Sequence, residues 1–172
     1  MSQADERVRM KVDGLVFDPL SNTPIIILKD EAGGRSLPIW VGYPEATAIA
    51  LEMETVVTPR PMTHDLIKNL LDALKATLQH VTVNDLKDNT FYAKLSLQVE
   101  TGEIEVDSRP SDAIAIALRV GCPIYVRASV LEEAKNNSEL NKQGAVQPPE
   151  DEEQFKRWLD DIRPSDFGKM DQ

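Results

Sequence analysis

The sequence predicts an α+β domain with a mixed or antiparallel sheet and two to three packed helices, plus a short C-terminal helix on an acidic linker. Three observations support this class. Residues Thr90–Val99 alternate strictly between apolar and polar side chains, as in a half-buried strand. Other apolar residues recur at helical spacing. A stretch near the middle of the chain, Ala113–Val120, is apolar on every side, which is typical of a buried helix.

The N-terminal part of the chain predicts a meander of three strands. The turn Ser21–Pro24 separates the first two strands, and a turn with Gly33 and Gly34 separates the second from the third. Pro38 cannot donate a backbone hydrogen bond, so we expect the third strand at an edge of the sheet or at a bulge. The expected strands are Val8–Asp18, Ile25–Leu28 and Ser36–Val41.

Two helices are expected after the meander. The first runs from Glu45 to about Glu54, and its core face carries Ala46, Ile49, Ala50 and Met53. Thr63 is a good N-cap for the second, which runs to about Leu78. Five leucines form one stripe along this second helix: Leu66, Leu70, Leu71, Leu74 and Leu78.

The second half of the chain adds more strands and two helices. In the strand Glu103–Asp107, Ile104 and Val106 are expected to point inward. The central helix follows, and Ser129 then caps a short helix through about Lys135. The expected strands are His80–Leu86, Thr90–Val99, Glu103–Asp107 and Ile124–Arg127.

The central segment Asp107–Val120 begins with a run of polar residues. Pro110 fits the first helical position, where its missing N–H group costs nothing. Asp107, Arg109, Ser111 and Asp112 therefore lie at one rim of a core helix. Two interpretations stay open: a well-capped core helix, or a polar site at a helix N-terminus that suits an anionic group such as phosphate.

The charge of the chain limits its partners. The net charge is −10, shared equally between residues 1–128 and the much shorter segment 129–172. A protein this acidic has no general affinity for polyanions, so nucleic acid would need a local site or a metal. The single cysteine, Cys122, excludes an intrachain disulfide and is expected to be a buried, inert thiol. Without an apolar run near the length of a membrane span or an N-terminal leader, we expect a cytoplasmic protein with no membrane contact.

The chain divides into three parts. Residues 1–7 form a flexible N-terminus, residues 8–135 form the domain, and residues 136–172 form an acidic linker with a C-terminal amphipathic helix. That helix, which Pro164 ends, is expected to dock on the domain or on a neighbouring subunit. Its apolar residues at helical spacing are Phe155, Trp158, Leu159 and Ile162.

The sequence contains no glycine-rich phosphate loop, paired Cys-x-x-Cys or His-Glu-x-x-His motif, and it has only two histidines. What remains is a set of polar residues that begin or precede helices. If these helix starts converge, carboxylates could hold Mg²⁺ or Mn²⁺, arginines a phosphate, and His64 could transfer a proton. The alternative is a structural network of ion pairs. The set is Glu45, Arg60, His64, Asp65, Asp107, Arg109, Ser111 and Asp112.

Three segments, supported by Thr90–Ala93, resemble the bifunctional nuclease (BFN) domain family over about residues 8–135. The segments are Gly42–Ile49, Arg60–Leu66 and Asp107–Ala115. The tail ending in Pro164–Phe167 is similar to tails of some bacterial members. Glu54–Thr55 departs from the family, in which a glycine commonly follows the helix. The resemblance implies an α+β domain that self-associates into a homo-oligomer and cleaves both RNA and DNA.

The leading hypothesis is a nuclease that is assisted by a divalent metal, Mg²⁺ or Mn²⁺. The alternative is a non-catalytic oligomeric module that binds a small anionic ligand or a protein partner. In the nuclease, carboxylates carry the ion, Arg109 holds the phosphate, and His64 is a general acid or base. The expected catalytic residues are Glu45, His64, Asp65 and Asp112, those for substrate binding are Arg60, Arg109 and Ser111, and those for the metal are Glu45, Asp65, Asp107 and Asp112.

Overall fold

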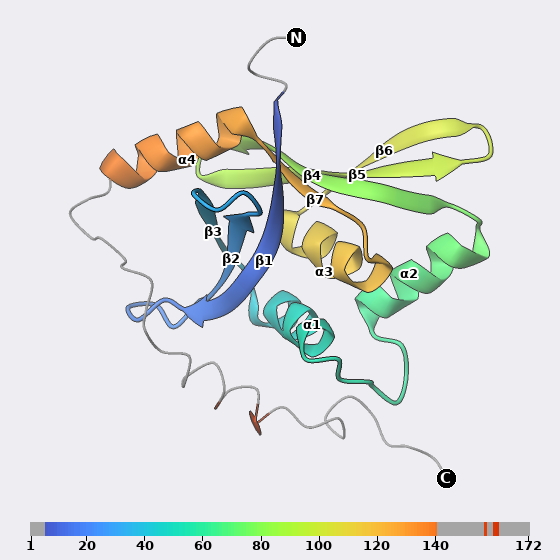
Figure 1. The fold of residues 1–172 in the computed structure, drawn as a ribbon. Coiled ribbons are helices and arrows are strands. Elements are labelled where there is room, and N and C mark those ends of the chain that lie inside the picture. Colours follow the sequence, from blue (N-terminus) through green and yellow to red (C-terminus); the bar gives the residue numbers. More distant parts are fainter. Residues whose placement is uncertain (1–5, 141–156, 158–159, 162–172) are drawn as a thin grey trace.

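The computed structural model describes residues 6–140, 157 and 160–161. Its strands form one mixed sheet in the order β3-β2-β1-β7-β4-β5-β6, in which the β4–β7 pair is parallel and the others are antiparallel (Figure 1). The α+β class is therefore confirmed. The strands are β1 (Arg7–Phe17), β2 (Pro24–Asp30), β3 (Ser36–Trp40), β4 (Thr77–Lys87), β5 (Thr90–Val99), β6 (Gly102–Ser108) and β7 (Ile124–Arg127).

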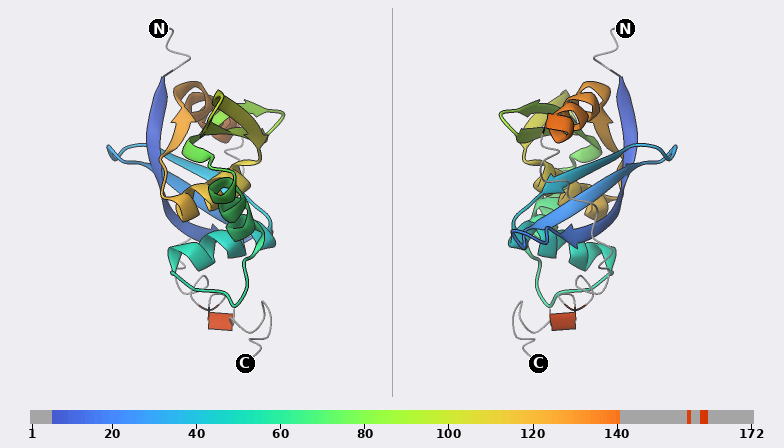
Figure 2. Two further views of the ribbon diagram at one scale, coloured as in Figure 1. Left: turned by 90° about the vertical axis from the view of Figure 1, so that its right-hand side faces the viewer. Right: turned by 90° about the vertical axis from the view of Figure 1, so that its left-hand side faces the viewer.

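Helices lie on both sides of the central strands. The helix α3 contacts α1, α2, β4 and β5, whereas α4 contacts β4 and β7. Figure 1 shows α3 below these strands and α4 above them, and Figure 2 shows α1 and α4 toward opposite ends of the molecule. The helices are α1 (Tyr43–Met53), α2 (Thr63–Ala73), α3 (Pro110–Val120) and α4 (Ala128–Leu140).

The N-terminal meander has the predicted form. β1, β2 and β3 pair in sequence as antiparallel neighbours, and a register shift interrupts β1 between Val12 and Gly14. β3 is the last strand on its side of the sheet, so Pro38 lies in an edge strand, as its missing N–H group predicted.

The core lies between the sheet and the helices, and it includes Val130 and Leu131 of α4 as well as residues of α1 and α3. Residues Ala113–Ala117 of α3 are 0–3% exposed, which confirms that this apolar helix is buried. Pro110 is its first residue, and Gly121 ends it in the left-handed conformation with φ of 77°. On α1, Ala46, Ile49 and Ala50 are buried as predicted.

The second helix differs from its prediction at both ends. Met62, not Thr63, is its N-cap, and the helix ends at Ala73 rather than near Leu78. Lys75 has φ of 55°, which turns the chain, and Leu78 is a buried residue of β4. The helical spacing of the leucines continued across this turn by coincidence, because an apolar residue suits both the helix end and the strand that follows.

Part of the leucine stripe is open to solvent. Leu66, Leu70 and Leu74 are 51%, 51% and 76% exposed, while Ile67 and Leu71 pack against the core. Ile104 and Val106 point to the predicted face of the sheet, but they are only partly buried. They share a sheet face with the buried Leu97 and Leu95, but β6 is an edge strand and leaves them 45% and 43% exposed.

The predicted linker and most of the predicted C-terminal helix lie outside the described residues. Within the part of the chain that the structure describes, no helix has both the length and the apolar character that a membrane span requires.

Candidate functional site

The first turns of three helices meet on one side of the sheet. Glu45 is the third residue of α1, His64 is the second residue of α2, and Asp112 is the third residue of α3, with Arg109 as the N-cap of α3. These residues come together because α3 packs against both α1 and α2. The starts of these three helices therefore converge, as the sequence-based hypothesis of a shared polar site required.

Hydrogen bonds connect these four side chains into one chain, which we call the helix-start cluster. The Nε2 atom of His64 lies 2.9 Å from Oδ1 of Asp112. The other carboxylate oxygen of Asp112 accepts a hydrogen bond of 2.8 Å from Nε of Arg109. The Nη2 group of Arg109 donates to Oε1 of Glu45, also at 2.8 Å. Arg109 thus joins α3 to α1, and Asp112 joins α3 to α2 through His64.

Exposure varies along the cluster. The side chain of Arg109 is 66% exposed and that of Asp112 is 26% exposed, whereas Glu45 and His64 are 15% and 9% exposed. The cluster therefore opens to solvent on its arginine side and is closed on its histidine side. Gly42 leaves room for the Glu45 carboxylate, because a Cβ atom at this position would clash with Oε2.

The contacts of the cluster favour the charged form of the Asp112 carboxylate. Burial alone would raise the pKa of the Asp112 carboxyl, but the hydrogen bonds from His64 and Arg109 outweigh it and place this pKa below the usual range. The pKa of Arg109 is raised by its hydrogen bond to Asp112 and, next in size, by its hydrogen bond to Glu45. An ionised carboxylate only accepts hydrogen bonds, so His64 donates its Nε2 proton to Asp112.

Asp65 lies in the first turn of α2 next to His64, but it faces a different partner. Its carboxylate accepts hydrogen bonds from the backbone N–H of Met62 at 2.9 Å and from Nε of Arg119 at 2.6 Å. The guanidinium of Arg119 is 4% exposed and also donates to the carbonyl oxygens of Ala115 and Ala48. Asp65 therefore joins α2 to α1 and α3 through a buried arginine.

The side chains of the other predicted site residues form no hydrogen bond or ion pair with the helix-start cluster. Arg60 is exposed in the loop before α2, and its side chain makes no hydrogen bond or ion pair with a described residue. Ser111 is 6% exposed in the first turn of α3, so its side chain is largely closed to solvent. Asp107 lies on β6 opposite Lys94 of β5, and therefore on the sheet face that alternates with the one carrying Leu95 and Leu97.

The four predicted metal ligands do not all come together. Within the described residues, no group of three or more His, Cys, Asp or Glu side chains could hold a metal ion. Glu45 and Asp112 are the two carboxylates of the helix-start cluster, and Arg109 already lies between them. The protein side chains alone thus do not form a three-ligand metal site in this arrangement.

Sequence reasoning missed Arg119. The residue is the only charged side chain between Ala113 and Val120, so a buried cation within an apolar helix was the available signal. Its partner could not be named, because Asp65 is 54 residues away in the chain.

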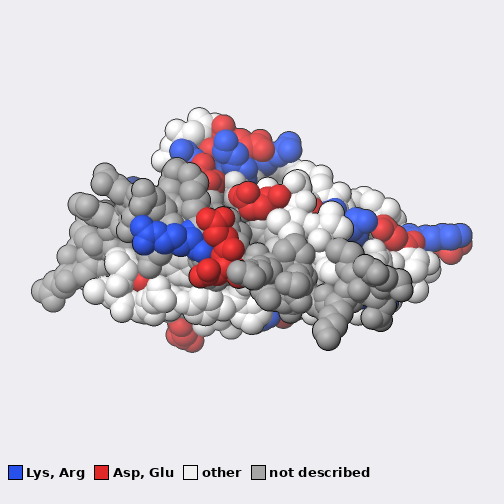
Figure 3. Space-filling view, turned by 90° about the horizontal axis from the view of Figure 1, so that it is seen from below, with Lys and Arg blue, Asp and Glu red and all other residues white. Residues whose placement is uncertain are grey.

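Acidic and basic side chains alternate around this part of the surface. On the face seen in Figure 3, Lys and Arg side chains form separate small groups, each next to acidic side chains. This face of the described residues therefore carries charges of both signs in local groups (Figure 3).

The fold and the helix-start cluster define an α+β domain with a polar site where three helix N-termini converge. The chain belongs to the bifunctional nuclease domain family, because the family model described as "Bifunctional nuclease domain" matches residues 26–139. This finding confirms the family that the sequence motifs indicated.

Relatives fall into two groups. An uncharacterized protein of Mycobacterium tuberculosis is 45% identical over 161 residues, which cover 92% of this chain and 96% of the relative. Bifunctional nuclease 2 of Oryza sativa subsp. japonica is 32% identical over 62% of this chain and 34% of its own length. Bifunctional nuclease 1 of Arabidopsis thaliana is 33% identical over 60% of this chain and 33% of its own length. The chain thus spans about a third of each of these plant nucleases.

We predict that Asp65→Ala lowers the free energy of unfolding by about 2–3 kcal/mol at neutral pH, because it leaves the buried Arg119 without its carboxylate. Although burial raises the pKa of Asp65, hydrogen bonds from Met62 and Arg119 outweigh it and lower this pKa. The stabilisation is therefore present above about pH 4 and is lost as the pH falls through the lowered pKa of the folded state. Urea unfolding at a series of pH values measures both effects.

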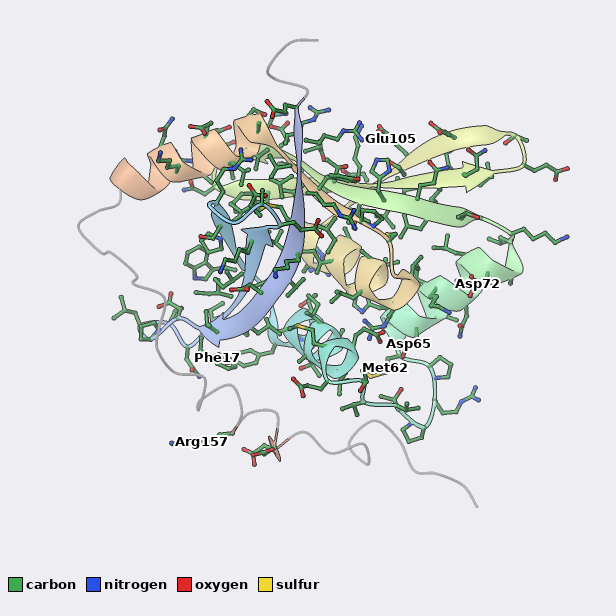
Figure 4. The ribbon with its side chains drawn as sticks, in the orientation of Figure 1. Phe17, Met62, Asp65, Asp72, Glu105 and Arg157 are labelled. Carbon is green, nitrogen blue, oxygen red and sulfur yellow. The ribbon has the colours of Figure 1, made fainter. Side chains whose placement is uncertain are left out.

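Asp72→Ala is the matched control on the same helix. Asp72 is 66% exposed and pairs with Lys68 one turn away, so its loss should change stability by no more than about 0.5 kcal/mol. Figure 4 shows Asp65 beside Met62 at the start of α2 and Asp72 toward the other end. Equal effects of the two substitutions would contradict the anchoring role of Asp65.

Proposed function

We propose that this protein is a nuclease that hydrolyses phosphodiester bonds of RNA and DNA at the helix-start cluster. The observation that carries the proposal is the hydrogen-bonded chain His64–Asp112–Arg109–Glu45, in which the guanidinium of Arg109 is exposed to solvent. Membership of the bifunctional nuclease domain family supports the same reaction class.

Each side chain has a role that its contacts favour. Arg109 binds the scissile phosphate, because a guanidinium has five N–H donors and the cluster uses Nε and Nη2. His64 transfers a proton, and Asp112 fixes its tautomer by accepting from Nε2. Glu45 and Asp112 hold the arginine in place until the phosphate arrives.

We propose that the cleavage reaction requires a divalent metal, Mg²⁺ or Mn²⁺. Mg²⁺ is commonly bound through one or two carboxylates together with substrate phosphates, and Glu45 and Asp112 are the carboxylates available at the cluster. The bound ion would neutralise phosphate charge, which an acidic protein otherwise repels.

We also propose that the chain forms a homo-oligomer through the exposed leucines of α2. Leu66 and Leu74 lie four residues on either side of Leu70, so antiparallel packing of two α2 helices about Leu70 would place each Leu66 against Leu74 of the other copy. A second copy would cover three leucines that the monomer leaves more than half exposed.

The cleavage prediction concerns the cluster directly. We expect His64→Ala and Asp112→Ala to reduce cleavage of labelled single-stranded RNA and DNA by about 100-fold or more, because proton transfer by a positioned side chain contributes on that order. Cleavage is measured with Mg²⁺, with Mn²⁺ and with chelator, on the purified full chain.

Lys68→Gln serves as the control, because Lys68 is an exposed partner of Asp72 on α2. Cleavage that persists unchanged in both cluster variants would refute the site. No cleavage by the unmodified protein under any metal, together with a stable oligomer and a ligand-dependent thermal shift, would favour a non-catalytic module that binds a small anion or a protein partner.

The oligomer prediction uses the double variant Leu70→Ser with Leu74→Ser. We expect its dissociation constant for self-association to rise at least about tenfold, because buried apolar side chains dominate such interfaces. Sedimentation velocity over a concentration series measures it. Leu20→Ser is the control, since Leu20 is 87% exposed in the turn between β1 and β2. A monomer at all concentrations, or equal behaviour of the variants, would contradict the proposal.

A further inference from the structure

A second polar group lies on the sheet face that carries α4, at the start of that helix. We call it the α4-start cluster, and it comprises Arg7 of β1, Arg127 of β7, and Thr82 and Asn84 of β4. α4 begins at Ala128, directly after Arg127, and has no acidic residue in its first turn. The N-terminus of a helix attracts anions, and here no side chain of the first turn supplies the negative charge.

The two arginines face each other without a carboxylate partner. Arg7 and Arg127 are directly opposite in the antiparallel β1–β7 pair, where like charges destabilise a sheet. The Nη1 group of Arg7 lies 2.9 Å from Nε2 of His80, which must accept because a guanidinium can only donate. The side chain of Arg127 forms no hydrogen bond or ion pair with a described residue.

The nearest acidic side chains already hold their own lysines. Glu105 of β6 accepts a hydrogen bond of 2.5 Å from Lys94, and Asp85 forms an ion pair of 2.5 Å with Lys87. The hydrogen bond from Lys94 lowers the pKa of Glu105 most, and the charges of Arg7 and Arg127 lower it further from a distance. Figure 4 shows Glu105 on the side of the sheet away from α1 and α2.

Two buried polar atoms on the same face lack partners. Thr82 is 6% exposed, and neither its Oγ1 atom nor Oδ1 of Asn84 has a hydrogen-bond partner within the described part of the chain. Thr82 lies opposite Tyr125, two residues before Arg127, so all these side chains project from one sheet face. Buried polar groups are normally hydrogen-bonded, so the Thr82 hydroxyl, which can donate, indicates a missing acceptor, whereas the Oδ1 atom of Asn84 can only accept and needs a donor.

We propose that the α4-start cluster binds a phosphate group. The two guanidiniums can donate paired hydrogen bonds to phosphate oxygens, and the unpartnered Thr82 hydroxyl can donate one more. The N-terminus of α4 favours the negative charge. The phosphate is either free or part of a nucleic-acid backbone. The inference goes beyond the proposed nuclease, because the α4-start cluster lies across the sheet from the helix-start cluster.

The first test is binding in the presence of chelator, where no metal-assisted cleavage occurs. Inorganic phosphate is titrated against the full chain at constant ionic strength, with chloride as the balancing anion, and thermal unfolding is followed. We expect phosphate to raise the midpoint by about 2 °C or more at saturation, because a ligand of the folded state stabilises it. A labelled oligouridylate, followed by fluorescence anisotropy, tests the backbone phosphate.

Three substitutions at the site and one control on α2 make the test specific. Arg127→Gln should weaken binding of the responding ligand at least about fivefold, whereas Lys68→Gln on α2 should leave it unchanged. Thr82→Val should raise the midpoint of the free protein, since it removes an unpartnered buried hydroxyl, and should reduce the response to phosphate. Glu105→Gln should strengthen binding, because it removes a carboxylate that competes for the same cations.

A response to inorganic phosphate alone assigns the site to free phosphate, and a response to the oligonucleotide that Arg127→Gln weakens assigns it to the nucleic-acid backbone. No response to either ligand beyond that to chloride, or an equal response in the unmodified protein, Arg127→Gln and Glu105→Gln, overturns the proposal. Loss of cleavage in the helix-start variants is a separate result and leaves this inference untouched.

Discussion

The buried guanidinium of Arg119 is the contact on which the arrangement of the three helices depends. Its side chain is 4% exposed, and it donates to Asp65 of α2 and to the carbonyl oxygens of Ala48 in α1 and Ala115 in α3. A buried cation is costly unless its protons have partners. Because these partners come from all three helices, a shift of any one helix would leave part of the guanidinium unsatisfied.

The helix N-termini meet at the helix-start cluster, about two turns along α3 from Arg119, and this meeting creates an electrostatic requirement. Three positive dipole ends in one place repel each other, and acidic residues in the first turns offset the repulsion. Each of the three helices has one such residue: Glu45 on α1, Asp65 on α2 and Asp112 on α3. Structural need thus explains why acids begin all three helices, while only Glu45 and Asp112 contact the exposed Arg109.

Local patterns predicted the strands well and the tertiary partners poorly. The alternation in Thr90–Val99 gave β5 with its bounds, and Pro38 gave the edge position of β3. The end of α2 was missed because Leu74 and Leu78 fit both a helix and the turn into β4. The meeting of helix starts could be anticipated from their polar residues, but the pairing of Asp65 with Arg119 depends on how α2 lies on α3, which no local pattern encodes.

The path of α2 across α3 also separates His64 and Asp65, which hold α2 on α3, from Arg109, which is exposed to solvent. Neighbouring residues His64 and Asp65 contact Asp112 and Arg119, which lie seven residues, about two turns, apart on one face of α3. His64 is 9% exposed, so replacing it disturbs packing as well as proton transfer. Arg109 is 66% exposed and precedes α3 as its N-cap, so replacing it would remove the proposed phosphate ligand and its two ion pairs but would disturb packing less than replacing His64. A substitution of Arg109 therefore tests phosphate binding by the cluster with less effect on the stability of the fold than a substitution of His64.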